Sequence, residues 1–135
     1  MLLSSLSFYS LLKVFTGLVF SALFLQSGFD KVMDFKGNRA WITTYFEKSP
    51  FSRFSSLLFM LLTITELAAG LASFFGVVYF VFAQTAWLMQ AGIALSSMAL
   101  LFVFTGQRIA KDYTSAANTI SYIAAAMLAW YIVSK

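Results

Sequence analysis

The sequence VVYFVFAQTAWLMQAGIALSSMALLFVF, residues 77–104, contains no Asp, Glu, Lys or Arg. A helix that crosses the hydrocarbon core of a bilayer needs about 20 mainly apolar residues, because the core is about 30 Å thick and each helical residue advances about 1.5 Å. Residues 77–104 are therefore long and apolar enough to form a membrane-spanning helix.

Three further stretches of the chain meet the same requirement. They are residues 6–28, 50–75 and 115–133. Ser49-Pro50 predicts the start of the second span, because Ser caps helices and Pro suits the first helical position. Little more than Gly76 separates the second span from the third, which predicts a tight antiparallel hairpin. We predict that residues 1–135 form one all-α domain, an integral membrane four-helix bundle with both termini on one side.

The composition supports this class and excludes several others. Hydrophobic residues make up 61% of the chain and charged residues 10%, against about 45–50% and about 25% in soluble domains, so a soluble monomer is excluded. The chain has no His and no Cys, which removes the commonest metal ligands and the usual general base. We expect no catalytic residue, no metal site, no covalently bound cofactor and no activity as an enzyme on its own. The basic residues are dispersed among apolar runs, so nucleic acid is not an expected partner.

The segment 29–48 is the only extended polar region. Gly37-Asn38 is expected to interrupt it, and residues 39–48 then predict a short interfacial helix between the first and second spans. Its apolar and aromatic residues alternate with Arg and Lys, as suits the headgroup layer of a bilayer. A solvated loop with aromatic anchors is the alternative interpretation.

Lys and Arg are concentrated in two connections, the first and the third. They are Lys31, Lys36, Arg39, Lys48, Arg53, Arg108 and Lys111. The opposite side has only Lys13 and Lys135. Because cytoplasmic loops carry an excess of Lys and Arg, the charged connections are predicted to face the cytoplasm and the termini the outside. Lys13, which precedes the first apolar run, argues for the reverse.

Each predicted span has a stripe of small residues. The stripes are Gly17 and Ser21; Ala69, Ala72, Ser73 and Gly76; Gly92 and Ser96; and the ladder Ala117, Ser121, Ala125 and Ala129. Small residues allow helix backbones to approach closely inside a membrane. We predict that these stripes are the packing surfaces of the bundle.

Glu66 lies in the middle of an apolar run and is predicted to be near the bilayer midplane. An acidic residue at that depth costs about 2.5–3.5 kcal/mol on insertion scales, so it should face the bundle interior and have a partner. It shares a helix face with Thr63, Gly70 and Ser73, and the space left by Gly70 is expected to give its carboxyl group room to meet another helix. The candidate partners are Gln84, Gln90 and Gln26. Two hypotheses are open: a pocket that binds a ligand headgroup or relays a proton, or a protonated Glu66 that only bonds two helices together.

A second cluster of candidate residues lies at the charged membrane face. It comprises Asp30, Lys31, Arg39, Arg108, Lys111 and Asp112. The spacing favours pairing of Lys31 with Asp34 and of Arg108 with Asp112. These residues are either ordinary charges at helix ends or a basic pocket for an anionic lipid headgroup or a polar substrate head.

Three motifs resemble the DoxX family of small four-helix membrane proteins. They are FLQSGFDK at 24–31, TELAAG at 65–70 and GQRIAKDY at 106–113. Gly28 and Lys31 match the end of the first helix in that family, and Glu66 and Gly70 match its acidic-then-small motif. The resemblance implies a location in the bacterial plasma membrane and a link to quinone-dependent oxidoreductases.

Combined with the absence of metal and haem ligands, this resemblance favours an accessory subunit that binds a quinone or lipid and receives electrons from a partner. One alternative is a structural or assembly partner of another membrane protein, or of further copies of this chain. A small proton-coupled transporter is less favoured, because no inverted repeat or broken span is evident.

Overall fold

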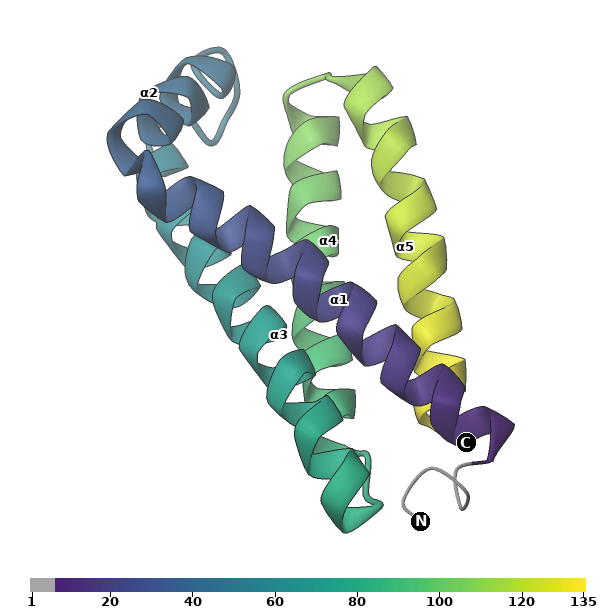
Figure 1. Cartoon of the computed structure of the whole chain (residues 1–135). Helices are drawn as coiled ribbons and strands as arrows, with labels where there is room; N and C mark the ends of the chain where they lie inside the picture. Colours follow the sequence, from purple (N-terminus) through teal and green to yellow (C-terminus); the bar gives the residue numbers. More distant parts are fainter. Residues whose placement is uncertain (1–6) are drawn as a thin grey trace.

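The computed structural model describes residues 7–135, and every regular element in that range is a helix (Figure 1). The helices are α1 (Phe8–Met33), α2 (Phe35–Tyr45), α3 (Ser55–Ala83), α4 (Trp87–Ile109) and α5 (Tyr113–Val133). All except α2 are long and apolar enough to cross a membrane. The prediction of an all-α four-helix membrane bundle is confirmed. The first predicted span began at residue 6, which lies outside the described residues.

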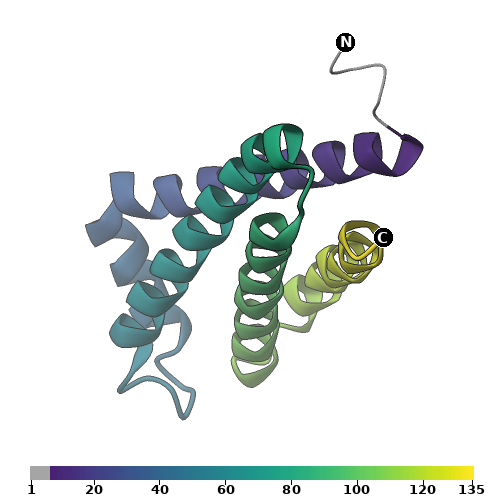
Figure 2. The ribbon, with the colours of Figure 1, turned by 90° about the horizontal axis from the view of Figure 1, so that it is seen from below.

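The helices α1, α3 and α4 form the main packing unit. α3 packs along both α1 and α4, whereas α5 packs mainly against α4 and makes few contacts with α1 (Figure 2). α2 and the α4–α5 turn lie at one end of the bundle, and the start of α1 lies with the C-terminus at the other. The two charged connections are therefore on the same side, as predicted.

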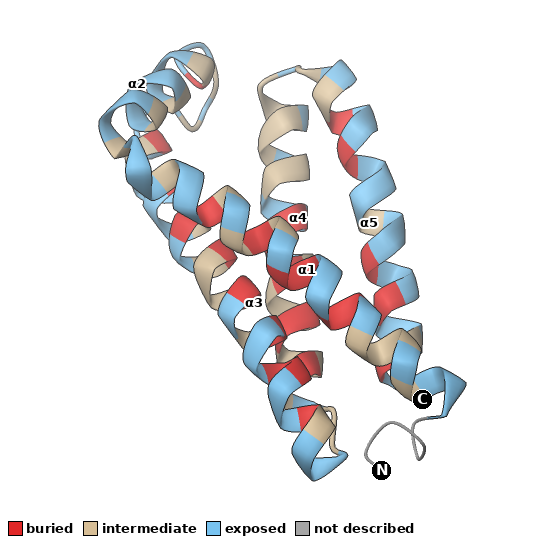
Figure 3. Cartoon of the chain, in the orientation of Figure 1, coloured by how far each residue is buried: buried red, intermediate tan, exposed pale blue. Residues whose placement is uncertain are grey.

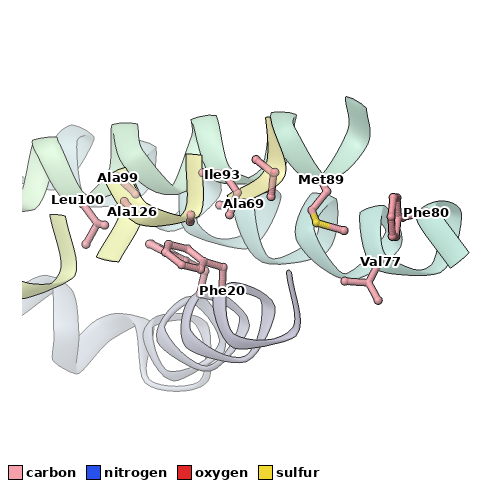
Figure 4. Packing of buried hydrophobic residues seen from close by; sticks show 12 residues of the cluster. Phe20, Ala69, Val77, Phe80, Met89, Ile93, Ala99, Leu100 and Ala126 are labelled. Carbon is pink, nitrogen blue, oxygen red and sulfur yellow. The ribbon is translucent and has the colours of Figure 1, made fainter. Parts of the chain in front are cut away.

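The core is a cluster of apolar side chains from all four long helices. Phe20, Ala69, Met89 and Ile93 belong to it, and the last three are fully buried (Figure 4). Aliphatic and aromatic side chains fill the space between helices whose backbones approach closely at small residues. This arrangement is the expected one in lipid, where close van der Waals packing holds helices together.

The predicted small-residue stripes of α1, α3 and α4 are confirmed. Gly17, Ser21, Ala69, Ser73, Gly76, Gly92 and Ser96 are all buried, and Ala72 is partly buried. The contact between α3 and α4 is the closest: a Cβ placed on Gly76 would lie 2.6 Å from the Met89 Cα, and one on Gly92 would lie 2.6 Å from the Ser73 amide nitrogen. At both positions only glycine fits without separating the helices.

The predicted ladder on α5 is wrong over most of its length. Ala129 is buried, but Ala117, Ser121 and Ala125 are exposed (Figure 3). The buried face of α5 instead carries Ala116, Thr119, Ala126, Ala129 and Val133. α5 has small residues on two faces. α4 packs against the face that also contains Val133, which is buried.

Two predicted helix boundaries are also wrong. Gly76 is not a turn, because α3 continues to Ala83 and ends where Gln84 adopts a left-handed conformation with φ of 54°. The third span therefore begins at Trp87 rather than residue 77. Ser49-Pro50 does not start α3, because residues 49–54 form turns and the helix begins at Ser55.

The interfacial helix exists but begins earlier than predicted. Gly37-Asn38 does not interrupt α2, because the Asp34 carboxylate accepts from the Gly37 amide at 3.2 Å and caps the helix. The Asn38 side chain donates to the carbonyl oxygens of Asp30 and Asp34 at 3.2 and 2.9 Å. These bonds make Asn38 a link between α1 and α2 instead of a break.

Candidate functional site

Glu66 on α3 bonds to two side chains of α1. The Lys31 Nζ lies 2.9 Å from Glu66 Oε2, and the Ser27 hydroxyl donates to Glu66 Oε1 at 3.1 Å. Lys31 Nζ also donates to the Ser27 hydroxyl at 2.9 Å and to the Ser27 carbonyl at 3.4 Å. Ser27, Lys31 and Glu66 thus form a closed polar triangle, which we call the Lys31–Glu66 cluster.

Local sequence explains how α1 reaches Glu66. Ser27 and Lys31 are four residues apart, so they lie one above the other on one helix face. Glycines on both helices bring the backbones together around them: a Cβ on Gly28 would lie 2.6 Å from Leu67 Cδ2, and one on Gly70 would lie 2.7 Å from the Leu25 amide nitrogen. The expectation that Gly70 lets the Glu66 carboxyl group meet another helix is therefore confirmed, because α1 packs into the space that a side chain at position 70 would fill.

The two charges differ in their access to solvent. The Glu66 side chain is 5% exposed and the Lys31 side chain is 21% exposed. Lys31 is in the last turn of α1, where the helix dipole favours a cation. Glu66 therefore faces the bundle interior and has a partner, as predicted, but the partner is the Lys31 ammonium beside the end of α1.

None of the three glutamines predicted as partners bonds to Glu66. Gln84 donates to the carbonyl oxygens of Phe80 and Val81 at the end of α3, and Gln90 donates to the Val133 carbonyl of α5 at 3.0 Å. Gln26 is exposed. Thr63, Gly70 and Ser73 do share the buried face of α3 with Glu66, as predicted.

The predicted pairs at the charged face are not formed. Lys31 bonds to Glu66 rather than Asp34, and Asp34 caps α2. The Arg108 guanidinium lies 4.6 Å from the centre of the Tyr113 ring, while Asp112 caps α5 through the Ser115 amide. Asp30, Arg39 and Lys111 are exposed and lie outside the Lys31–Glu66 cluster.

One connection at this face was not anticipated from the sequence. The Tyr45 hydroxyl donates to Asp112 Oδ2 at 2.8 Å and so joins α2 to the α4–α5 turn. Next to it, Phe46 is buried and its ring faces Gly106 of α4. Burial and the neighbouring carboxylate raise the pKa of Tyr45, and the bonds from Ser115 and Tyr45 lower the pKa of Asp112. The Asp112 cap was detectable from its position before a helix, but its bond to Tyr45 was not.

Two apolar grooves lie on other faces of the bundle. One is between α4 and α5 and includes Ser97 and Trp130, and the other is between α1 and α5 and includes Thr16 and Ala125. Neither includes Lys31 or Glu66. Within residues 7–135, no three acidic side chains gather where they could hold a metal ion.

The fold and site define a small four-helix integral membrane protein with one buried interhelical ion pair. No protein-family model, curated protein or solved structure matches the chain. The resemblance to the DoxX family stays a prediction.

Proposed function

We propose that the protein is a DoxX-like accessory membrane protein that binds the polar head of a quinone or lipid at the Lys31–Glu66 cluster and associates with a membrane oxidoreductase. The observation that supports this proposal is the buried cluster itself. A carboxylate that is 5% exposed between two spanning helices is costly in an apolar medium, and such residues are functional candidates by default.

The chemistry of the cluster suits an oxygen-containing headgroup. The Lys31 side chain is 21% exposed and its ammonium group donates hydrogen bonds, while Glu66 accepts one hydrogen bond from Ser27 and forms an ion pair with Lys31. A carboxylate has about four acceptor sites, so Glu66 retains capacity for a ligand hydroxyl group. Since the sequence has no His or Cys, electrons for any quinone chemistry would come from a partner protein.

Glu66→Gln is expected to reduce the amount of co-purified quinone or lipid by about tenfold or more, because a charge-assisted hydrogen bond contributes about 1.5–3 kcal/mol. Extraction in a mild detergent followed by mass spectrometry of bound lipids and proteins measures this. Thr65→Val is the matched control, because Thr65 is the neighbouring residue on α3 and bonds only to the Leu61 carbonyl. Wild-type protein recovered without quinone, specific lipid or partner would contradict the proposal.

A second candidate is a purely structural or assembly role, and two observations favour it. Lys31 donates to the Ser27 hydroxyl and carbonyl and forms an ion pair with Glu66, so each charge of the pair has a partner within the protein. In addition, α5 exposes Ala117, Ser121 and Ala125, which would let a helix of another protein or another copy approach closely. This candidate predicts that Glu66→Gln leaves the co-purified lipids unchanged.

We further propose that the protein lies in a bacterial plasma membrane with its charged connections in the cytoplasm. Seven of the nine basic residues lie in the last turn of α1, in α2, in the turns before α3 or around the α4–α5 turn. These segments share one end of the bundle (Figure 1), and cytoplasmic loops carry such an excess.

Single-cysteine variants can test this orientation cleanly, because the chain has no native cysteine. In intact cells, a membrane-impermeant thiol reagent is expected to label Ser134→Cys near the C-terminus and to leave Lys48→Cys unlabelled until the cells are lysed. The reverse pattern would show the opposite orientation.

A further inference from the structure

Six exposed cations surround the end of the bundle that carries α2. They are Lys36, Arg39, Lys48, Arg53, Arg108 and Lys111, and we call them the cationic collar. They come from α2, from the turns before α3 and from the α4–α5 connection. The opposite end of the described chain has two cations, Lys13 and Lys135, which lie over the rings of Phe80 and Tyr131.

The cations of the collar have no carboxylate partners. Among residues 7–135, the only ion pair with an N–O distance of 4.0 Å or less joins Lys31 to Glu66. Among the acidic groups at this end, Asp34 caps α2, and Asp112 caps α5 and accepts from Tyr45. Asp30 and Glu47 are exposed and form no ion pair with the collar. Six cations against these four carboxylates leave an excess of positive charge at one end of an apolar bundle.

α2 is oriented so that its cations point away from the bundle. Its half-buried residues, Phe35, Asn38, Ile42 and Tyr45, follow helical spacing and define the inner stripe. Phe35 packs on Phe59 of α3, and Tyr45 bonds to Asp112. Lys36 and Arg39 lie off this stripe and are exposed. Because the inner stripe is anchored to the bundle, these two cations face the surroundings of the protein.

Exposed aromatic rings accompany the cations. Trp41 on α2 is 60% exposed and stacks on Tyr45. Phe54 and Tyr113 are each 53% exposed; Phe54 follows Arg53 in the sequence, and the Tyr113 ring lies under the Arg108 guanidinium. Large rings next to Lys and Arg are typical of the headgroup level of a bilayer, where the ring lies in the boundary layer and the cation reaches phosphate.

We infer that the cationic collar binds the headgroups of anionic phospholipids in the leaflet that surrounds it. Charge complementarity carries the inference, because the collar has six cations without a carboxylate partner. An anionic membrane surface attracts each nearby Lys or Arg by about 1 kcal/mol, which is about fivefold in affinity. This binding is separate from the Lys31–Glu66 cluster, because none of the collar residues contributes to it.

Tryptophan quenching by brominated lipids tests the inference close to the collar. The full chain with Trp87→Phe and Trp130→Phe retains Trp41 as its only tryptophan and is reconstituted in vesicles of phosphatidylcholine with brominated phosphatidylglycerol. Quenching is expected to show at least a fivefold preference for phosphatidylglycerol over phosphatidylcholine near Trp41. Replacing all six collar cations by Gln should reduce the preference to near unity, and Lys36→Gln with Arg39→Gln should give an intermediate value.

The matched control is Lys13→Gln with Lys135→Gln, which removes the two cations of the opposite end and should leave the preference unchanged. Equal quenching by both lipids in the parent protein, or an unchanged preference in the six-site variant, would overturn the inference. So would loss of the preference in inorganic phosphate but not in sodium chloride of equal ionic strength, since that result would indicate a pocket for free phosphate.

Discussion

Lys31→Met is expected to destabilise the bundle by about 3–5 kcal/mol, because it leaves the buried Glu66 carboxylate without its counter-ion. Lys31 Nζ is the only cation within 4.0 Å of Glu66 among the described residues, and the carboxylate would keep only the hydrogen bond from Ser27. Reversible unfolding in mixed micelles, followed by far-UV circular dichroism, measures the loss. Lys36→Met is the control, because Lys36 is exposed and unpaired; its effect should be small.

The double variant Lys31→Met with Glu66→Met separates the ion pair from the packing around it. Replacement of a whole buried pair by apolar residues is often neutral or stabilising, so the double variant should recover most of the stability lost in Lys31→Met. Equal destabilisation by Lys31→Met and Lys36→Met, or an additive double variant, would show that the pair is not coupled.

Together with the single variant Glu66→Met, these proteins form a double-mutant cycle, which also discriminates between the two candidate functions. A double variant that is stable but has lost its co-purified quinone or lipid supports a ligand site at the cluster. A double variant that is stable and retains the same lipids and partners supports the structural role. Stability and ligand retention are measured on the same preparations, so misfolding is not mistaken for loss of a site.

The spans and the buried face of α3 could be predicted from the sequence because both follow from local periodicity. Glu66, Thr63, Gly70 and Ser73 recur at helical spacing, and this face is buried in the structure. The burial of Glu66 follows from the same pattern, since a carboxylate in an apolar span must avoid lipid.

The partner of Glu66 could not be predicted, because it depends on the axial alignment of α1 and α3. That alignment is set where Gly28 meets Leu67 and Gly70 meets Leu25, and no single-helix pattern contains it. The length of α3 also differs from the prediction, because this helix begins at Ser55 and continues past Gly76 to Ala83. Gln84 and Gln90 therefore lie at the opposite end of the bundle from the cluster, whereas Gln26 is next to Ser27 in the sequence but is exposed.

The packing face of α5 was ambiguous for a different reason. The helix has small residues on two faces, one with Ala117, Ser121 and Ala125 and one with Ala116, Ala126 and Ala129. Small size permits close approach on either face, so the choice depends on which face fits α4. Only the arrangement in space shows this choice.

Gly92→Ala is expected to destabilise the bundle by about 2–3 kcal/mol, since forcing an extra carbon into a packed interface typically costs about 1–3 kcal/mol. The added Cβ would lie 2.5 Å from the Ser73 hydroxyl oxygen and 2.6 Å from the Ser73 amide nitrogen. A helix backbone cannot yield as a side chain does, so α3 and α4 must separate. The same unfolding measurement in mixed micelles applies.

Gly106→Ala is the matched control, because it makes the same change in the same helix. There the added Cβ would meet only the Phe46 ring, 3.1 Å from its Cζ, and the end of a side chain can shift by a few tenths of an ångström. Removal of glycine from a helix contributes up to about 1 kcal/mol of stability, so Gly106→Ala should be neutral or slightly stabilising. The two alanine variants therefore share the propensity gain and differ in the backbone contact alone. Equal stabilities for both would mean that α3 and α4 are not in close contact at Ser73 and Gly92.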